Sequence, residues 1–118
     1  MKEITADQIF NLHPKITWAG FATLNGELSF AKMRPNVESL WPPAMDESFA
    51  QLGPMLVLGV CDRLVQWAGP LDHVTGIYEK VALVITKLND GYLAITINRS
   101  DLSFLQEITE KLKTLTME

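Results

Sequence analysis

The sequence is poor in the residue types on which most enzyme chemistry depends. Its 118 residues include one cysteine, Cys61, and two histidines, His13 and His73. A single cysteine excludes an intrachain disulfide, and the isolated histidines do not provide the three or four clustered ligands of a zinc site. The glycines form no phosphate-binding loop pattern. We therefore expect no catalytic, metal-binding or cofactor-binding residues, and a protein that is not an enzyme.

The reactive side chains that are present each have a simpler structural interpretation. Cys61 follows an apolar helical segment, and nothing places a histidine beside it to activate the thiol, so we expect a buried structural cysteine. His73, next to Asp72, is interpreted as a structural or surface histidine. Asp46 and Glu47 are typical of the first turn of a helix, where the helix dipole favours negative charge.

Positive charge and long apolar segments are also scarce. The net charge is −4, and the lysines and arginines are scattered, which disfavours nucleic-acid binding. The longest apolar segment, around residues 52–61, is far shorter than the roughly 20 residues of a membrane span. The first residues carry acids and lack the apolar core of a secretory signal. We expect a soluble cytoplasmic protein without direct membrane insertion.

The pattern of predicted elements is that of a single α+β domain over residues 1–118. The 47% apolar content suits a folded chain with one core. A capping-box pattern at residues 5–8 begins a short first helix. Residues 73–78, 81–88 and 92–98 have the composition of strands, and a last helix follows. With the hairpin and middle helix below, the order is α-β-β-α-β-β-β-α.

The dipeptide Asn25-Gly26 separates two strand-like segments, residues 16–24 and 27–33. Asn-Gly is typical of a two-residue hairpin turn. Alternation gives one large apolar face and one face of small residues: Phe21, Leu28 and Phe30, against Gly20, Ala22, Ser29 and Ala31. The large face needs a packed layer, and the small face lets a helix approach closely. We therefore expect a sheet covered on both sides, with Phe21 opposite Phe30.

Residues 46–67 predict a helix that is apolar around most of its circumference. Gly53-Pro54 interrupts the pattern, and Pro54 either kinks one helix or begins a second one. A helix that is apolar on several faces needs burial on more than one side. Packing within a two-layer domain is one interpretation; self-association, with a second copy supplying the other side, is the favoured one.

Trp41 lies in a proline-rich loop, residues 34–45. Aromatic residues anchor many interfaces, and loops often carry binding residues, so Trp41 is the best single candidate for contacting a partner. The alternative, which we favour, is that Trp41 covers the hydrophobic core.

Three segments resemble the roadblock/LC7 family, a branch of the profilin-like folds. Trp-Ala-Gly-Phe-Ala-Thr-Leu-Asn-Gly-Glu-Leu, residues 18–28, resembles the opening hairpin of the family. Residues 78–88 with residues 89–95, Asn-Asp-Gly-Tyr-Leu-Ala-Ile, resemble its second sheet segment. Met-Arg-Pro-Asn-Val, residues 33–37, resembles the exit from the hairpin in archaeal relatives. The resemblance covers almost the whole chain.

The resemblance implies a five-stranded antiparallel sheet in the order 2-1-5-4-3. The middle helix would cover one face, and the N- and C-terminal helices the other. Members commonly dimerise through the middle helix and the third strand, which correspond here to residues 54–67 and 73–78. The implied dimer interface contains Met55, Leu56, Leu58, Gly59, Arg63, Trp67, Val74, Gly76 and Tyr78.

The resemblance also implies a function without chemistry. Family members act as scaffolds for small GTPases, dynein and the assembly of membrane complexes. The expected function is therefore a dimerising interaction scaffold that docks or regulates a small GTPase, with no cofactor. The alternative is a small-molecule sensor of profilin-like or PAS-like shape, which would need a cavity with convergent polar groups.

Overall fold

The computed structural model describes residues 4–56, 59, 61, 63–88 and 91–116. Its five strands form one antiparallel sheet in the order β2-β1-β5-β4-β3, so the predicted α+β class and strand order are confirmed. The elements are α1 (Ala6–Phe10), β1 (Ile16–Thr23), β2 (Leu28–Met33), α2 (Ala44–Leu56), α3 (Val65–Ala68), β3 (Val74–Ile77), β4 (Val81–Leu88), β5 (Gly91–Asn98) and α4 (Leu105–Lys113). Within the described part of the chain, no helix has the length and apolarity needed to cross a membrane.

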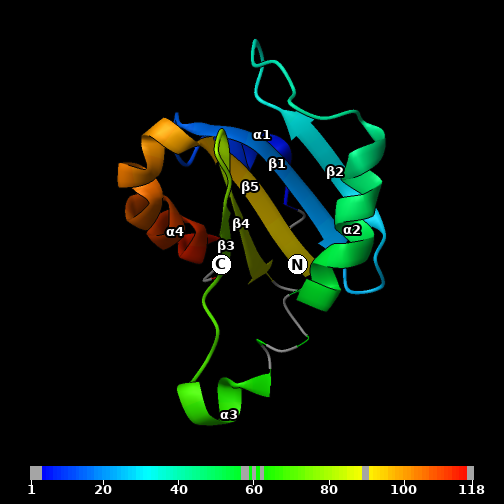
Figure 1. Ribbon diagram of the computed structural model, residues 1–118, viewed down its shortest axis with the longest axis vertical. Coiled ribbons are helices and arrows are strands. Elements are labelled where there is room, and N and C mark those ends of the chain that lie inside the picture. The colour runs from blue at the N-terminus through cyan, green and yellow to red at the C-terminus, as the bar shows by residue number, and fades with distance from the viewer. Residues whose placement is uncertain (1–3, 57–58, 60, 62, 89–90, 117–118) are drawn as a thin grey trace.

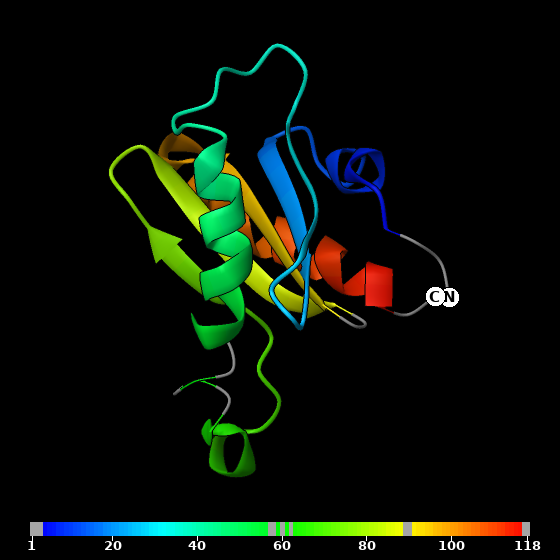
Figure 2. The same cartoon turned by 90° about the vertical axis from the view of Figure 1, so that its right-hand side faces the viewer.

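The sheet separates two layers of helices. Helix α2 lies on one face, and α1 and α4 lie on the other (Figures 1 and 2). The larger core cluster fills the α1 and α4 side, and its members include Ile9, Ile16, Leu93, Ile95 and Ile108. A smaller cluster lies on the α2 side, where Trp18, Ile85, Tyr92 and Ala94 are buried. The two-sided cover that the hairpin pattern predicts is therefore present.

Arg34 fastens α1 to the sheet. Its Nε donates to the carbonyl of Ile16 at 2.6 Å, and its Nη2 donates to the carbonyls of Phe10 and His13 at 2.8 and 2.7 Å. The guanidinium also lies over the Phe10 ring, 5.0 Å from its centre. One side chain thus satisfies carbonyls at the end of α1, in the following loop and at the start of β1. This fork geometry is specific to arginine.

The hairpin turn differs from the predicted one. The N–H of Gly26 donates to the carbonyl of Thr23, and the N–H of Thr23 donates to the carbonyl of Glu27. Only Gly26 in this turn has a positive φ, of 85°. The loop therefore has three residues, a type I turn followed by glycine in the left-handed conformation, because a two-residue type I′ turn would need a positive φ at Asn25 as well.

A bulge in the hairpin absorbs the extra loop residue. Phe21 lies opposite Phe30, as predicted, but the register shifts at the next position, where Ala22 lies opposite Leu28. The turn also lies against α2: a Cβ on Gly26 would be 3.6 Å from the carbonyl oxygen of Ala50. The hairpin is therefore part of the packing between sheet and helix.

The middle helix begins two residues before its predicted start at Asp46. Helix α2 begins at Ala44, carries Asp46 and Glu47 in its first turn as predicted, and continues through Gly53-Pro54 to Leu56. Pro54 has no N–H, so the helix lacks the bond that this position would otherwise donate to the carbonyl of Ala50. Gly59, Cys61 and Arg63 have helical geometry, and the short α3 follows, with Gly69 as its C-cap at a φ of 89°. The predicted helix as far as about residue 67 therefore agrees with the described residues of this segment, which are helical except for Leu64; residues 57, 58, 60 and 62 lie outside the described residues.

Replacing Arg34 by lysine tests the role of its fork. Lysine keeps the charge but cannot hold three carbonyls in this geometry, so Arg34→Lys should lower the free energy of unfolding by about 2 kcal/mol. Urea unfolding measures the change. The control is Arg99→Lys, because Arg99 is exposed and its side chain makes one such bond, to the carbonyl of Tyr78. Equal losses for the two variants would contradict the fastening role.

Candidate interaction surface

Helix α2 covers only part of its face of the sheet. It packs mainly on β1 and β2, and Figure 1 shows it lying over these two strands while β4 and β3 extend away from it. On the uncovered side, Val81, Leu83 and Val74 are only half-buried. An apolar sheet face without a covering layer is typical of a surface that binds another molecule.

Trp18 forms the floor of the α2 side and explains the small residues of the hairpin. It is 3% exposed. Its indole ring lies over Gly20, where an added Cβ would be 2.6 Å from a ring atom. The space that the small residues leave open is therefore filled by an aromatic ring from the same strand. We did not predict a role for Trp18 in the core or in binding, although a glycine two residues further along a strand is a recognisable signal of such a contact.

Trp41 packs on the edge of this floor. Its ring meets that of Trp18 in a T-shaped arrangement, with the ring centres 5.6 Å apart. Its Nε1 donates to Oδ1 of Asp46 at 3.1 Å, which fixes the loop to the first turn of α2. Trp41 is half-buried, whereas the preceding Leu40 is 56% exposed. Trp41 therefore covers the core, as the favoured interpretation holds, and still offers surface to a partner.

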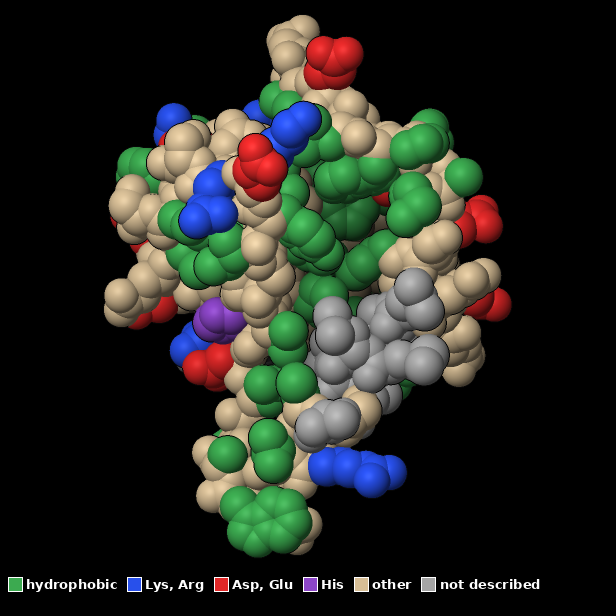
Figure 3. Space-filling model, in the orientation of Figure 1, with side chains coloured by type: hydrophobic (Ala, Val, Ile, Leu, Met, Phe, Trp, Pro, Cys, Tyr) green, Lys and Arg blue, Asp and Glu red, His purple; other side chains and the backbone are tan. Residues whose placement is uncertain are grey.

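A groove of about 490 Å³ runs between the first half of α2 and the β3–β4 turn. Its floor is formed by Trp18, Leu83 and Thr96, one wall by Trp41, Met45, Asp46 and Phe49, and the other by Tyr78, Glu79, Lys80 and Val81. We call it the Trp18 groove. Figure 3 shows hydrophobic side chains gathered around this hollow.

The polar groups of the Trp18 groove do not converge on a common point. The Thr96 hydroxyl lies 2.8 Å from that of Thr17, and Asp46 already accepts from Trp41. In the parts of the chain that the structure describes, no three His, Cys, Asp or Glu residues are grouped as metal ligands. The groove is therefore suited to an apolar or aromatic side chain rather than to a reacting substrate.

Strand β3 is the outermost strand beside β4, and its outer edge faces away from the sheet. The N–H of Tyr78 donates to the carbonyl of Val81, and antiparallel hydrogen bonding to a neighbour alternates along a strand. The N–H and C=O groups of Thr75 and Ile77 therefore point outward. Ile77 is 53% exposed. Such an edge is a template for pairing with another strand.

The structure places the predicted interface residues in two separate regions. Val74, Gly76 and Tyr78 alternate along one side of β3 and its end, on the α2 face. Arg63 and Trp67 lie on a projecting segment, residues 63–73, which we call the α3 arm (Figures 1 and 2). Gly59 is half-buried. The side chains of Met55 and Leu56, and the whole of Leu58, lie outside the described residues.

The remaining candidates for chemistry are far from a common site. Cys61 is a free thiol and is half-buried, so the expectation of a buried cysteine is not met. His73 is also half-buried. His13 is buried: its Nδ1 accepts from the N–H of Lys15 at 3.1 Å, which leaves its Nε2–H to donate to Glu107. This histidine joins the loop after α1 to α4 and is structural.

These features define a class of protein: a domain with a five-stranded antiparallel sheet, one helix on one face and the terminal helices on the other. The chain has a roadblock/LC7-like fold, which agrees with the resemblance. A roadblock/LC7 domain from Streptomyces avermitilis has a TM-score of 0.65 at 12% identity, over 94% of this chain and 88% of that one.

Two structures of MglB have similar arrangements. MglB with a tetrameric arrangement has a TM-score of 0.65 at 10% identity, over 94% of this chain and 84% of that one. The gliding protein MglB from Thermus thermophilus has a TM-score of 0.62 at 12% identity, with the same coverage. At these identities the likeness shows the fold. No protein-family model and no curated protein matches the sequence.

The double role of Trp41 gives a graded prediction. Trp41→Phe keeps a ring against Trp18 but loses the bond to Asp46, so the free energy of unfolding should fall by about 1 kcal/mol. Trp41→Ala also removes the ring contact and should cost about 2 kcal/mol or more. Urea unfolding and near-ultraviolet circular dichroism of the tryptophan pair measure both effects. Leu40→Ala is the control and should change stability by less than about 0.5 kcal/mol; a similar loss at both positions would refute the assignment.

Proposed function

We propose that this protein is a non-enzymatic scaffold that dimerises through β3 and the adjoining α2 face. The observation that carries the proposal is the coincidence of an unpaired strand edge with an uncovered apolar sheet face on the same side of the domain. In the described part of a single copy, the outer edge of β3 has no paired strand and Val74, Val81 and Leu83 are only half-buried. A second copy related by a two-fold axis would pair the edges and bury much of the face, and isologous pairs of this kind are the commonest oligomers.

The fold supports self-association. The resemblance to the roadblock/LC7 family implies dimers with one continuous sheet, and one similar MglB structure is described as having a tetrameric arrangement. The candidate contacts on β3 are Val74, Gly76 and Tyr78. Tyr78 is 60% exposed, and an exposed aromatic residue beside an unpaired edge is a typical interface anchor.

The partner class that the resemblance implies is a small GTPase. In this proposal the dimer docks or regulates the GTPase. Its own cysteine and histidines take no part in catalysis. The scattered positions of Cys61, His73 and His13 support this view. The dimer would present a surface made by two copies to one partner.

A small-molecule sensor is the second candidate, and the Trp18 groove is the observation that favours it. A volume of about 490 Å³ lies within the range of ligand pockets. Two of the polar groups that line it, on Thr96 and Asp46, already bond to Thr17 and Trp41, however, and so provide little specificity for a small ligand. The groove ranks below the strand edge as a guide to function.

Introducing proline at Ile77 tests the dimer. The N–H of Ile77 points away from β4, so proline removes a donor from the outer edge and leaves the β3–β4 ladder in place. The wild-type protein should be a dimer at micromolar concentration, and Ile77→Pro should weaken the dimer at least about tenfold. Sedimentation equilibrium measures both values.

The matched control is Ile77→Thr, which keeps the N–H and the branched side chain and should remain dimeric. Circular dichroism should show that both variants are folded. A wild-type protein that is monomeric at micromolar concentration would refute the proposal, as would a Kd for Ile77→Pro equal to that for Ile77→Thr.

The GTPase partner requires a separate experiment. The wild-type dimer, immobilised and exposed to native lysate, should retain a small GTPase in a manner that depends on whether GTP or GDP is added. Ile77→Pro should lose this retention if the docking surface needs both copies. If no GTPase is retained with either GTP or GDP, the proposed partner class is refuted, whereas the dimer proposal is unaffected.

A further inference from the structure

We propose that, in the dimer, Trp67 of each copy occupies the Trp18 groove of the other copy. This inference rests on the dimer proposed above and names the contact that completes it. The groove is then a site that one chain cannot fill, and the α3 arm is the element that a second chain supplies.

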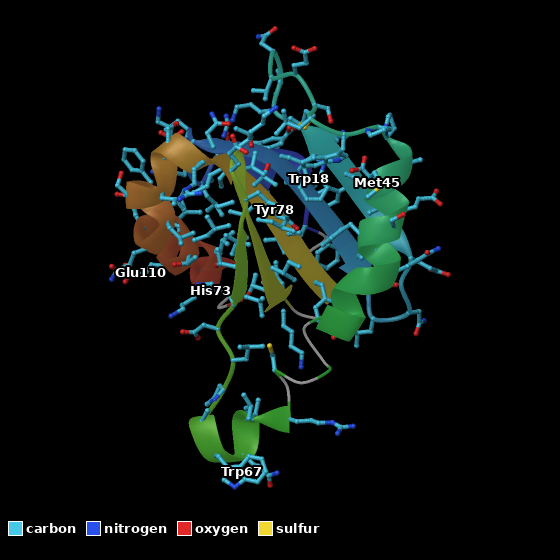
Figure 4. The ribbon with its side chains drawn as sticks, in the orientation of Figure 1. Trp18, Met45, Trp67, His73, Tyr78 and Glu110 are labelled. Atoms are coloured by element: carbon cyan, nitrogen blue, oxygen red, sulfur yellow. The ribbon has the colours of Figure 1, made fainter. Side chains whose placement is uncertain are left out.

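In a single copy, the Trp67 side chain is mostly exposed to solvent and gains little from packing. It is 77% exposed, and Leu64, three residues earlier on the same side of α3, is 52% exposed. Figure 4 shows Trp67 at the end of the α3 arm, far from Trp18, Met45 and Tyr78. An exposed tryptophan on a projecting segment forgoes the burial that usually stabilises this side chain, and tryptophan is the residue type most enriched at interface hot spots.

The Trp18 groove matches this side chain in size and chemistry. Its volume of about 490 Å³ exceeds that of one indole and leaves room for Leu64 as well. Trp18, Trp41 and Phe49 already pack edge to face, with ring centres 5.6 Å apart in both pairs. A further ring on Trp41 and Met45 would extend the same edge-to-face packing.

The symmetry of the proposed dimer brings the arm to the groove. Residues opposite each other in an antiparallel pair lie on the same face, so self-pairing of β3 about its middle places either Thr75 or Gly76 on the two-fold axis. The partner subunit's Val74 then lies opposite Gly76 or Tyr78. The α3 arm of the partner copy, which precedes its β3, therefore lies beside the β3–β4 turn of the first copy. That turn forms one wall of the Trp18 groove of the first copy.

The arm also arrives on the correct face of the sheet. A two-fold axis that continues one sheet into another runs perpendicular to it, so both copies of α2 lie on the same side. The α3 arm follows α2 along the chain and lies on the α2 side of the body in Figure 2. The Trp18 groove opens on that side too.

The charges at the two surfaces are complementary. Arg63 is exposed on the arm, four residues before Trp67. The walls of the Trp18 groove carry two acids, Asp46 and Glu79, and one base, Lys80. An arginine beside an aromatic anchor, facing a rim with an excess of acids, favours the correct orientation of the arm.

The first experiment uses two separate variants: one removes the Trp67 side chain, and the other blocks the Trp18 groove. Trp67→Ala should weaken the dimer about thirtyfold or more, because each dimer has two such contacts and a buried tryptophan is a typical hot spot. Met45→Glu, at a wall residue that is 51% exposed, should weaken it similarly. The matched controls are Leu24→Ala, at an exposed residue of the hairpin turn, and Ala44→Glu, one residue outside the groove; both should leave the Kd unchanged.

The second experiment distinguishes a contact between copies from one within a copy. A mixture of the Trp67→Ala and Met45→Glu proteins can form a mixed dimer in which an intact Trp67 meets an intact groove. Differently labelled chains, titrated together in sedimentation velocity, should associate at least about fivefold more tightly than either variant with itself.

Each result bears on the proposal. If the wild-type protein is a dimer and Trp67→Ala leaves its Kd unchanged, the inference is wrong and the dimer proposal stands. If Trp67→Ala weakens the dimer but the mixture gains nothing, the arm acts elsewhere and the inference is again wrong. If the wild-type protein is a monomer, the dimer proposal itself fails. Recovery in the mixture supports the exchange of arms.

Discussion

Helix α2, over its described residues Ala44–Leu56, covers only part of its face of the sheet, and the proposed assembly follows from this constraint. The α1 and α4 side has a closed core, whereas on the α2 side the described residues place the main helix contacts on β1 and β2 and leave Val74, Val81 and Leu83 of β3 and β4 half-buried. The uncovered half ends at an unpaired strand edge. Burial of apolar area is the dominant favourable term in folding and association alike, so this arrangement favours completion by a second molecule.

The half that α2 does cover depends on one aromatic ring. Trp18 lies over Gly20 and meets both Trp41 and Phe49, so strand, loop and helix share a single contact. This cluster fixes α2 over β1 and β2 and forms the floor of the Trp18 groove at the boundary of the uncovered half. The same contact thus stabilises the fold and shapes the surface that the proposed partner copy would use.

Much of the fold could be predicted from the sequence because alternation and turn residues are local signals. The strand order came from the family resemblance, and the opposition of Phe21 and Phe30 from the hairpin pattern. The predicted two-residue turn was wrong, because the hairpin has a three-residue loop and a bulge at Phe21/Ala22, and the Asn-Gly pattern alone does not indicate a bulge.

The candidate surface was less predictable, since apolar periodicity shows that a residue is suited to burial but not what buries it. Leu64, Val65 and Trp67 have the apolar character of a covered helix, yet Leu64 and Trp67 lie exposed beside and on α3. The role of Trp18 was not predicted. A small residue such as Gly20 indicates that a neighbouring group can approach the strand closely, but only the tertiary structure shows that this group is the Trp18 ring.

Hydrogen exchange of the β3 amides at several protein concentrations tests the central claim most directly. The N–H of Tyr78 is bonded to β4 and should be protected at every concentration. The outward N–H groups of Thr75 and Ile77 should be protected where the protein is dimeric and should exchange rapidly on dilution. Rapid exchange at Thr75 and Ile77 at all concentrations would contradict the claim that the uncovered half of the sheet is completed by a second copy.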